Sequence, residues 1–433
     1  MNPSMATTHA AKSASNPPPA RVDFTQDPTR AAAFALLGAV LDRRRGLDDA
    51  LDGLPALDPR DRAAAHRLAA TVLRRAGTLD AVLEPHLRRA PPPTVRHILR
   101  LGAAGLLLLD TPPHAAVATA VALARSQRLD PFAGLVNAVL RRVAEGGRAM
   151  LEQLDPPRLD TPAWLWTAWG ADARAIATAH QGEAPLDLTL RGGDAVAGGE
   201  ALPTGGLRFP SGTRPSELAG FEEGAFWVQD AAATLPALLL AARPGETVVD
   251  LCAAPGGKTA QLAATGARVT AVERDPKRLG RLRDNLARLR LEPELVQADA
   301  LEWRPPAPVD AVLLDAPCTA TGTIRRHPDV PHLKRPQDVA ALAAQQGRLI
   351  AAACAMLKPG GRLVYAVCSL QPEEGAMQAA RAHPGLVPAP FDAAELAMLP
   401  EALTPQGWLR THPGLWPGRG GMDGFFAARF VRS

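Results

Sequence analysis

The sequence predicts an all-helical domain followed by an α/β domain with a doubly wound, mainly parallel sheet, the two joined by a small connecting region. Three observations support this order. Apolar residues recur at helical spacing from Pro28 to about Ala144, a glycine-rich stretch follows, and from about Gly224 short β-branched runs alternate with helix-like segments. A chain of 433 residues is also too long for one ordinary core.

Four segments follow from this pattern. We expect a disordered tail at residues 1–24, an all-helical domain at 25–150, a connecting α+β subdomain at 151–223 and an α/β domain at 224–433. The tail is expected to be disordered because it is rich in Pro, Ala and Ser and has little to bury.

The helical segment has the clearest periodicity and a positive charge. RAAAFALLGAVLDRR and DRAAAHRLAATVLRR place apolar residues three and four positions apart, and prolines such as Pro59 and Pro91 separate the helices. Residues 21–150 contain 19 Arg against 13 Asp plus Glu, hence +6, whereas the whole chain carries +4. A positive domain of this size makes nucleic acid a reasonable partner.

The connecting segment contains Trp164, Trp166 and Trp169, followed by RGGDAVAGGEALPTGG. Aromatic side chains can stack on bases, but such a cluster more often packs in a small core or at a domain seam. We therefore expect these tryptophans to pack rather than to bind RNA.

The last segment has the rhythm of strand, turn and helix. We expect strands at ETVVD, RVTAVE, ELVQAD, VDAVLLD and GRLVYAV, and helices at PKRLGRLRDNLARLR and DVAALAAQQGRLIAAACAML. This alternation predicts a parallel sheet covered by helices on both faces. Ligands of such sheets bind at the carboxyl ends of the strands.

Three expected strand ends suit an adenosine-type cofactor. The first runs into Asp250 and a Pro-Gly-Gly turn at residues 255–257, which lets the backbone approach a ligand closely. The second ends at Glu273, whose carboxylate can accept both ribose hydroxyls, and the third is followed by Asp299, suited to an adenine amino group. Acidic residues after strands often only cap helices, but the three in this order favour cofactor binding.

Composition argues against several other classes of protein. No stretch reaches the roughly 18 to 20 uninterrupted apolar residues of a membrane span, and residues 1–20 lack the apolar core of a signal peptide. We therefore expect a soluble, cytoplasmic protein. The four cysteines form no C-x-x-C pair and no Cys/His cluster at zinc spacing, so neither a disulfide framework nor a metal site is expected.

The motifs of the α/β segment resemble those of the RNA cytosine-5 methyltransferases, which use S-adenosylmethionine. They are DLCAAPGGKT, LLDAPCTATGTIRRHPD, VYAVCSLQPEE and DGFFAARF, and together they span roughly Gly224 to Phe430. RRHPD and the preceding helical domain are most similar to bacterial members that act on 16S ribosomal RNA. The helical domain resembles the NusB-type RNA-binding fold through its pattern and HRLAATVLRR. The resemblance implies a Rossmann-like class I S-adenosylmethionine-dependent methyltransferase domain behind a NusB-like domain.

The resemblance also assigns a cofactor site. Glu273 would lie at the ribose, where several relatives have Asp, Asp299 near the adenine and Asp315 at the floor of the site. Lys258 would order the loop or meet the cofactor carboxylate, although a lysine that opens a helix can equally be a surface residue. The cofactor loop itself would consist of Cys252, Ala253, Ala254, Pro255, Gly256, Gly257 and Lys258.

Methylation at C5 of cytosine requires a nucleophilic cysteine, an acid near N3 and a base. A thiolate that adds to C6 turns C5 into an enamine-like carbon able to accept a methyl group, and loss of the C5 proton then lets the thiol leave. Cys318 and Cys368 both follow expected strands and precede the small or polar residues of loops. Buried packing is the alternative, because cysteine is among the most buried residue types.

The residues alone leave open which thiol attacks. DNA cytosine-5 methyltransferases use the cysteine of a Pro-Cys pair, which would nominate Cys318. Resemblance to the RNA family instead implies that Cys368 attacks, that Cys318 assists release of methylated RNA, and that Asp315 holds the base edge near N3. Cys252 and Cys354 are expected to be packing residues.

Basic residues supply candidate RNA contacts. Arg325, Arg326 and His327 follow Cys318 closely and can hold phosphates beside an unstacked base, or can form an ordinary exposed basic loop. Four arginines of the helical domain could likewise follow the RNA backbone or could belong to solvated helix faces. They are Arg74, Arg75, Arg141 and Arg142.

The leading hypothesis is a monomeric enzyme that methylates C5 of one cytosine in 16S ribosomal RNA, before or during small-subunit assembly, with S-adenosylmethionine as its cofactor. Transfer RNA is an alternative substrate. A non-catalytic ribosome-assembly or antitermination factor is an alternative of another class. The complete set of acidic residues and cysteines at strand ends argues against that last alternative.

Overall fold

The computed structural model describes residues 22–192 and 196–433. Most of the predicted disordered tail therefore lies outside the described residues. Its last residues do not behave as a tail, because Val22 and Phe24 pack against the core of the helical domain. The tail prediction through residue 24 was wrong at this end, since two isolated apolar residues in a polar context give no periodic signal.

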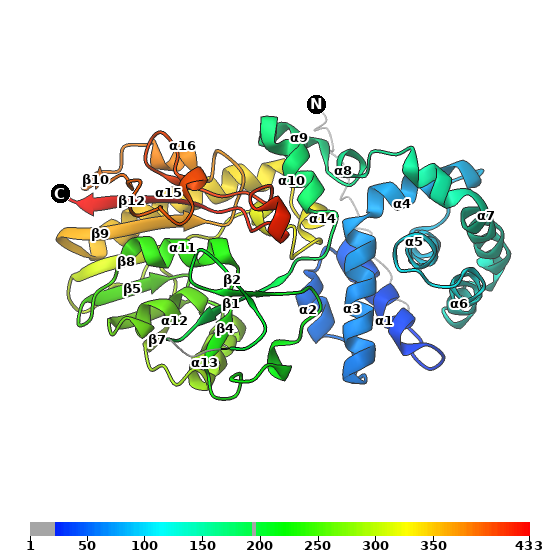
Figure 1. The fold of residues 1–433 in the computed structure, drawn as a ribbon, viewed down its shortest axis with the longest axis horizontal. Helices are drawn as coiled ribbons and strands as arrows, with labels where there is room; N and C mark the ends of the chain where they lie inside the picture. The colour runs from blue at the N-terminus through cyan, green and yellow to red at the C-terminus, as the bar shows by residue number, and fades with distance from the viewer. Residues whose placement is uncertain (1–21, 193–195) are drawn as a thin grey trace, which may run out of the picture.

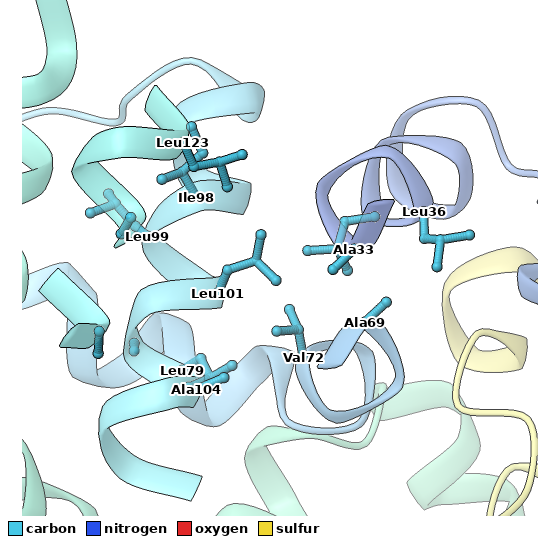
Figure 2. Packing of buried hydrophobic residues seen from close by; sticks show 14 of the residues in the cluster. Ala33, Leu36, Ala69, Val72, Leu79, Ile98, Leu99, Leu101, Ala104 and Leu123 are labelled. Carbon is cyan, nitrogen blue, oxygen red and sulfur yellow. The ribbon is translucent and has the colours of Figure 1, made fainter. Parts of the chain in front are cut away.

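The helical domain packs its helices around α5, which is buried along much of its length (Figure 1). Figure 2 shows side chains of α1, α3, α4, α5 and α6 meeting in this core. Four of the helices begin at a proline, which the first turn tolerates because its N–H groups need no helical partner. The helices are α1 (Pro28–Leu37), α2 (Leu47–Asp52), α3 (Pro59–Arg74), α4 (Ala76–Leu83), α5 (Pro93–Leu108), α6 (Pro113–Ser126) and α7 (Ala133–Glu152).

The connecting region contains three short helices and a small antiparallel sheet. The helices are α8 (Pro156–Leu159), α9 (Ala163–Trp169) and α10 (Ala173–Ala179). The sheet has the order β2-β3-β1-β4 and consists of β1 (Leu186–Leu190), β2 (Glu200–Ala201), β3 (Leu207–Phe209) and β4 (Phe226–Val228). The boundary predicted at residues 223 and 224 divides this sheet, because β4 pairs with β1.

The tryptophan cluster packs at a seam. Trp169 is buried, and Trp164 and Trp166 pack partly buried against the same apolar cluster, which also contains Ile324 and Val330 of the α/β domain. The expectation that the tryptophans pack is confirmed.

The α/β domain is built on one large sheet of order β10-β12-β9-β8-β5-β6-β7, with β11 paired to β12. All five predicted strands are present, and β5 to β9 run parallel. The terminal strand β12 differs, because it inserts antiparallel to β9. The strands are β5 (Thr247–Leu251), β6 (Arg268–Glu273), β7 (Glu294–Gln297), β8 (Val309–Asp315), β9 (Leu357–Val367), β10 (Leu386–Pro388), β11 (Leu409–Arg410) and β12 (Phe426–Arg432).

Helices cover both faces of this sheet (Figure 1). Successive side chains of β8 point to opposite faces and pack against different helices. Ala311 and Leu313 pack in the cluster of α11 (Ala231–Leu240) and α12 (Gly257–Ala264), whereas Val312 and Leu314 pack in that of α15 (Pro336–Met356). A further helix, α13 (Pro276–Arg288), packs beside α12. Among the described helices only α15 is long and apolar enough to cross a membrane, and half of its apolar window is buried in this core.

Candidate active site

The carboxyl ends of β5, β8 and β9 open onto a cavity of about 380 Å³. Because β5 lies between β6 and β8, the strand order reverses here, and such a switch point forms a crevice. The cofactor loop contributes Pro255, Gly256, Gly257 and Lys258 to the cavity. The strand ends contribute Asp250, Asp315 and Cys368.

The structure brings the two predicted active-site thiols together. Because β8 pairs with β9, the loops that follow them are neighbours, and Cys318 Sγ lies 3.4 Å from Cys368 Sγ. Cys368 lines the cavity, whereas Cys318 is not among its lining residues. The hydrogen bond with Cys368, reinforced by burial, raises the pKa of Cys318 well above its usual value. Cys318 is therefore a protonated thiol beside Cys368 at neutral pH.

Lys258 and Asp315 form an ion pair in the same cavity. Lys258 Nζ lies 2.8 Å from Asp315 Oδ2 and 4.8 Å from the ring centroid of Phe425. Burial alone would lower the pKa of Lys258, but the negative charge of Asp315 and its hydrogen bond outweigh burial and raise the pKa. Lys258 is thus a cation pointing into the site, and the surface alternative considered for it does not apply.

Asp250, near the end of β5, fixes the position of the cofactor loop. Its side chain is fully buried and accepts a hydrogen bond from Thr259 Oγ1 of α12, which fixes the loop between β5 and α12. Burial raises the pKa of Asp250 from 3.8 to about 7, and the nearby Asp315 adds to the effect. Its Oδ1 atom is buried without a hydrogen-bond partner.

The raised pKa of Asp250 predicts a pH-dependent stability. Between 3.8 and about 7 the folded protein retains a proton that the unfolded chain has lost, so the free energy of unfolding falls as pH rises through this window. Asp250→Asn should remove this contribution while keeping an acceptor for Thr259. Urea denaturation of both proteins across the window measures the difference, and parallel pH profiles would contradict the prediction.

The residues expected to hold S-adenosylmethionine fit that group. Glu273 is 2% exposed, its Oε1 accepts the Asp275 N–H, and its buried Oε2 lies 3.3 Å from Arg278 Nη1 without forming a hydrogen bond, so it can still accept from a ribose hydroxyl. Gly256 has φ of +108°, and a Cβ there would lie 2.4 Å from Leu282, so only glycine gives this close backbone turn. Asp299 follows β7 and accepts the Leu301 N–H. Glu273 and Asp299 lie outside the lining of the cavity that contains Cys368.

The other two cysteines have no reactive setting. Burial raises the pKa of Cys252 to about 12, with Glu273 adding to the effect. Cys354 is buried in the cluster of α15. Both therefore fit the packing role expected of them, Cys252 within the cofactor loop.

In the loop after Cys318, the candidate RNA contact Arg325 is not placed as predicted. Arg325 is 1% exposed, forms a salt bridge with Asp230 and donates to the Gly420 carbonyl. The structure contradicts a phosphate contact by Arg325, because its guanidinium is itself buried and is committed to Asp230. Arg326 and His327 do line the cavity. The side chain of Arg326 is 35% exposed and bound to Asp423.

The helical domain holds this same loop. The Leu47 N–H donates to Asp329 Oδ2 at 2.8 Å, and Arg74 Nη2 donates to the Arg325 carbonyl at 2.9 Å. Leu333 packs against the core of the helical domain. Arg74 is thus an interdomain contact rather than part of a solvated helix face, and it also lines the second cavity described below.

The other three candidate arginines of the helical domain divide into two kinds. Arg75 donates to Asp160 Oδ2 at 3.0 Å, and its side chain is 14% exposed. Arg141 and Arg142 are exposed on α7. A second cavity, of about 460 Å³, lies between the domains, and its lining includes Arg67, Arg75 and Arg326.

Phe425 and Glu374 are among the residues of the site to which the sequence assigned no role. Phe425 lines the cavity beside Lys258, and Glu374 is a buried carboxylate between the two cysteine loops. Both lie in motifs that carry the resemblance, DGFFAARF and VYAVCSLQPEE. For Glu374, the sequence shows only a glutamate in the segment that follows an expected strand. That position alone does not distinguish a buried carboxylate from one on the surface.

Comparison with known proteins decides the family. Residues 237–431 match the model of the 16S rRNA methyltransferase RsmB/F family, and residues 27–145 match the NusB family. Ribosomal RNA small subunit methyltransferase B of Sodalis glossinidius is 36% identical, over 93% of this chain and 97% of its own. The chain belongs to the RsmB/F family. Its relative of that name in Pseudomonas syringae is also 36% identical, over 93% of this chain and 96% of its own.

Membership of the RsmB/F family confirms the predicted methyltransferase and NusB-like domains and makes the protein an S-adenosylmethionine-dependent methyltransferase. Solved structures agree on the fold. The crystal structure of PH0851 matches with a TM-score of 0.70 at 23% identity, over 94% of this chain and 99% of that one. A methyltransferase homologue from Pyrococcus horikoshii matches with a TM-score of 0.51 at 26% identity, over 62% of this chain and 93% of that one.

Proposed function

We propose that this protein methylates C5 of one cytosine in 16S ribosomal RNA through a covalent bond between Cys368 and C6. The observation that carries the proposal is the pair of thiols 3.4 Å apart, one of which lines the cavity beside the cofactor loop. The chemistry requires this placement, because a nucleophile and a helper must act on the same ring.

The cofactor residues would present an electrophilic methyl group to this cavity. S-adenosylmethionine, when bound, supplies a methyl group on a positively charged sulfur. Glu273 would accept the ribose hydroxyls, Asp299 would face the adenine, and the backbone at Gly256 and Gly257 would lie against the ligand. The loop from Cys252 to Lys258 would hold it at the end of β5.

Cys368 is favoured as the nucleophile by its position and its neighbours. It lines the cavity, and the Lys258 ammonium lines the same cavity. Cys318 keeps its proton and can donate a hydrogen bond to the Cys368 sulfur. A water molecule acting as the base would take the C5 proton, the C5–H electron pair would form the C5–C6 double bond, and Cys368 would leave as a thiolate stabilised by that hydrogen bond.

The ion pair of Lys258 and Asp315 would act at the opposite edge of the base. Addition of a thiolate to C6 places negative charge on the ring near N3. Asp315 would hold that edge, and the ammonium of Lys258, 2.8 Å from Asp315, would offset the charge.

Lys258→Met should therefore slow methyl transfer strongly. Loss of a preorganised charge at a reacting centre typically lowers kcat by about 10² to 10³. Single-turnover methylation of RNA measures the step directly. Lys277→Met, which removes an exposed lysine of α13, is the matched control and should retain full activity. Equal rates in the two variants would remove Lys258 from the mechanism.

RNA would approach through the second cavity and the exposed basic residues around it. Arg67 and Arg326 line that cavity, and Arg326 also lines the one with Cys368, so a strand could pass from one to the other. His327 would contact RNA as a neutral group, because burial and the charge of Arg326 lower its pKa. We infer a monomer acting in the cytoplasm on RNA whose target base is still accessible.

Labelled S-adenosylmethionine tests the substrate. The protein is incubated with protein-free 16S RNA, with assembled small subunits and with transfer RNA, and the modified base is then mapped. We expect label at C5 of one cytosine in protein-free 16S RNA. Label in transfer RNA alone would contradict 16S RNA as the substrate. Label only in assembled subunits would contradict action before assembly.

A further inference from the structure

Glu374 is a buried carboxylate that the chemistry described above does not use. It lies six residues after Cys368 in the segment that follows β9, and its side chain is 0% exposed. Carboxylates are rarely buried without hydrogen-bond partners, because their removal from water is costly.

Its hydrogen bonds reach three separate elements. The Thr319 N–H donates to Oε1 at 2.9 Å, and the hydroxyl groups of Thr319 and Ser369 both donate to Oε2. Gln346 of α15 donates to Oε1 at 3.2 Å. Thr319 directly follows Cys318, and Ser369 directly follows Cys368, so one carboxylate joins the residues next to both thiols.

The carboxylate is held by these donors alone. Within residues 22–192 and 196–433, no Lys, Arg or His side chain forms a salt bridge with Glu374. An ionised carboxylate offers about four acceptor sites, and the four donors occupy them. A glutamine lacks the negative charge, and its NH₂ group cannot accept from the Thr319 and Ser369 hydroxyls, which would have to turn and accept from it instead.

We propose that Glu374 is a positioning residue that locks the two cysteine loops together and thereby sets the distance between Cys318 and Cys368. This inference rests on the proposed division of labour between the thiols, which requires Cys318 to reach the Cys368 sulfur. The negative charge of Glu374 also contributes to the raised pKa of Cys318, after the hydrogen bond with Cys368 and burial. Both effects keep Cys318 a thiol beside the nucleophile.

Phenylarsine oxide measures the thiol geometry without any RNA. Its arsenic forms two As–S bonds with a close pair of thiols and releases one water, with no oxidation of sulfur. The full-length protein should bind it at Cys318 and Cys368, and Cys318→Ala should not retain it. Glu374→Gln should weaken its retention against a competing small dithiol by about ten- to hundredfold, the loss expected for hydrogen bonds to a charged group. Retention equal to that of the unaltered protein would overturn the proposal.

Variants of Thr319 distinguish a loss of positioning from a general folding defect. Thr319→Ser keeps the hydroxyl and should behave as the unaltered protein does, whereas Thr319→Val should lose the arsenical as Glu374→Gln does. Thr234→Val removes an equally buried hydroxyl that bonds only within α11, and it should have no effect. If Thr234→Val and Thr319→Val weaken retention equally, Glu374 has only a general structural role.

Covalent capture of RNA provides the second readout. Thr319→Val displaces Cys318 but leaves Cys368 able to attack, so the covalent adduct should accumulate. A purely structural defect would instead lower both turnover and adduct. If no variant methylates any RNA, the proposed function fails, but the arsenical result still decides whether Glu374 sets the thiol pair.

Discussion

Cys368→Ala should abolish methylation of RNA and its covalent capture. Without the thiolate, C5 of cytosine is too poor a nucleophile to take the methyl group, and removal of a catalytic nucleophile costs about 10⁴-fold or more in kcat. The Cys368 side chain is the one of the two thiols that lines the cavity. Transfer of labelled methyl groups and denaturing electrophoresis of protein–RNA mixtures measure the two losses.

The same variant should still bind S-adenosylmethionine, because the residues expected to hold it lie on β5, β6, β7, β8 and their loops and not on β9. Cys354→Ala, at the buried cysteine of α15, is the matched control and should remain active. Normal turnover by Cys368→Ala would exclude it as the nucleophile.

Cys318→Ala should have the opposite signature, accumulation of a covalent protein–RNA adduct. Cys368 can still add to C6 and the methyl group can still be transferred. The departing thiolate then lacks the hydrogen bond from the sulfur 3.4 Å away, so release becomes slow. Gel-shifted protein that survives denaturation and disappears on nuclease treatment measures the adduct.

The two variants together separate the roles of the thiols. Adduct in Cys368→Ala and none in Cys318→Ala would exchange the roles and restore the Pro-Cys pattern of the DNA enzymes. Absence of adduct in both variants and in Glu374→Gln would argue against a covalent route.

The sequence was most informative about the strand ends. Five β-branched runs became β5 to β9, because short apolar runs between turn residues have few other structures available. Once β8 and β9 are neighbours in a parallel sheet, Cys318 and Cys368 must meet at one edge. The position of the cysteine pair was therefore predictable, although the 3.4 Å contact was not.

Side-chain partners far apart in sequence were not predictable. Arg325 looked like a phosphate ligand, but its partner Asp230 lies 95 residues away at the start of α11. Arg74 looked like an RNA or solvent contact, but its partner is a carbonyl 251 residues away in the loop after Cys318. Periodicity describes one segment at a time, so contacts between segments far apart in the sequence leave no pattern in either.

Short strands made the domain boundaries difficult to predict for a similar reason. Phe226–Val228 forms β4 of the small sheet, yet three apolar residues just before an α/β domain give no indication of which sheet they join. Glu374 is comparable, since its burial depends on Thr319 and Gln346 from other elements.

RNA containing 5-fluorocytidine tests the covalent route most directly. Fluorine at C5 cannot be removed as a proton, so the ring stays bound to the cysteine that attacked it. The full-length protein is incubated with such 16S RNA and S-adenosylmethionine, digested, and sequenced by mass spectrometry. We predict a modified nucleotide on the peptide that contains Cys368. A nucleotide on the Cys318 peptide, or on neither, would contradict attack by Cys368.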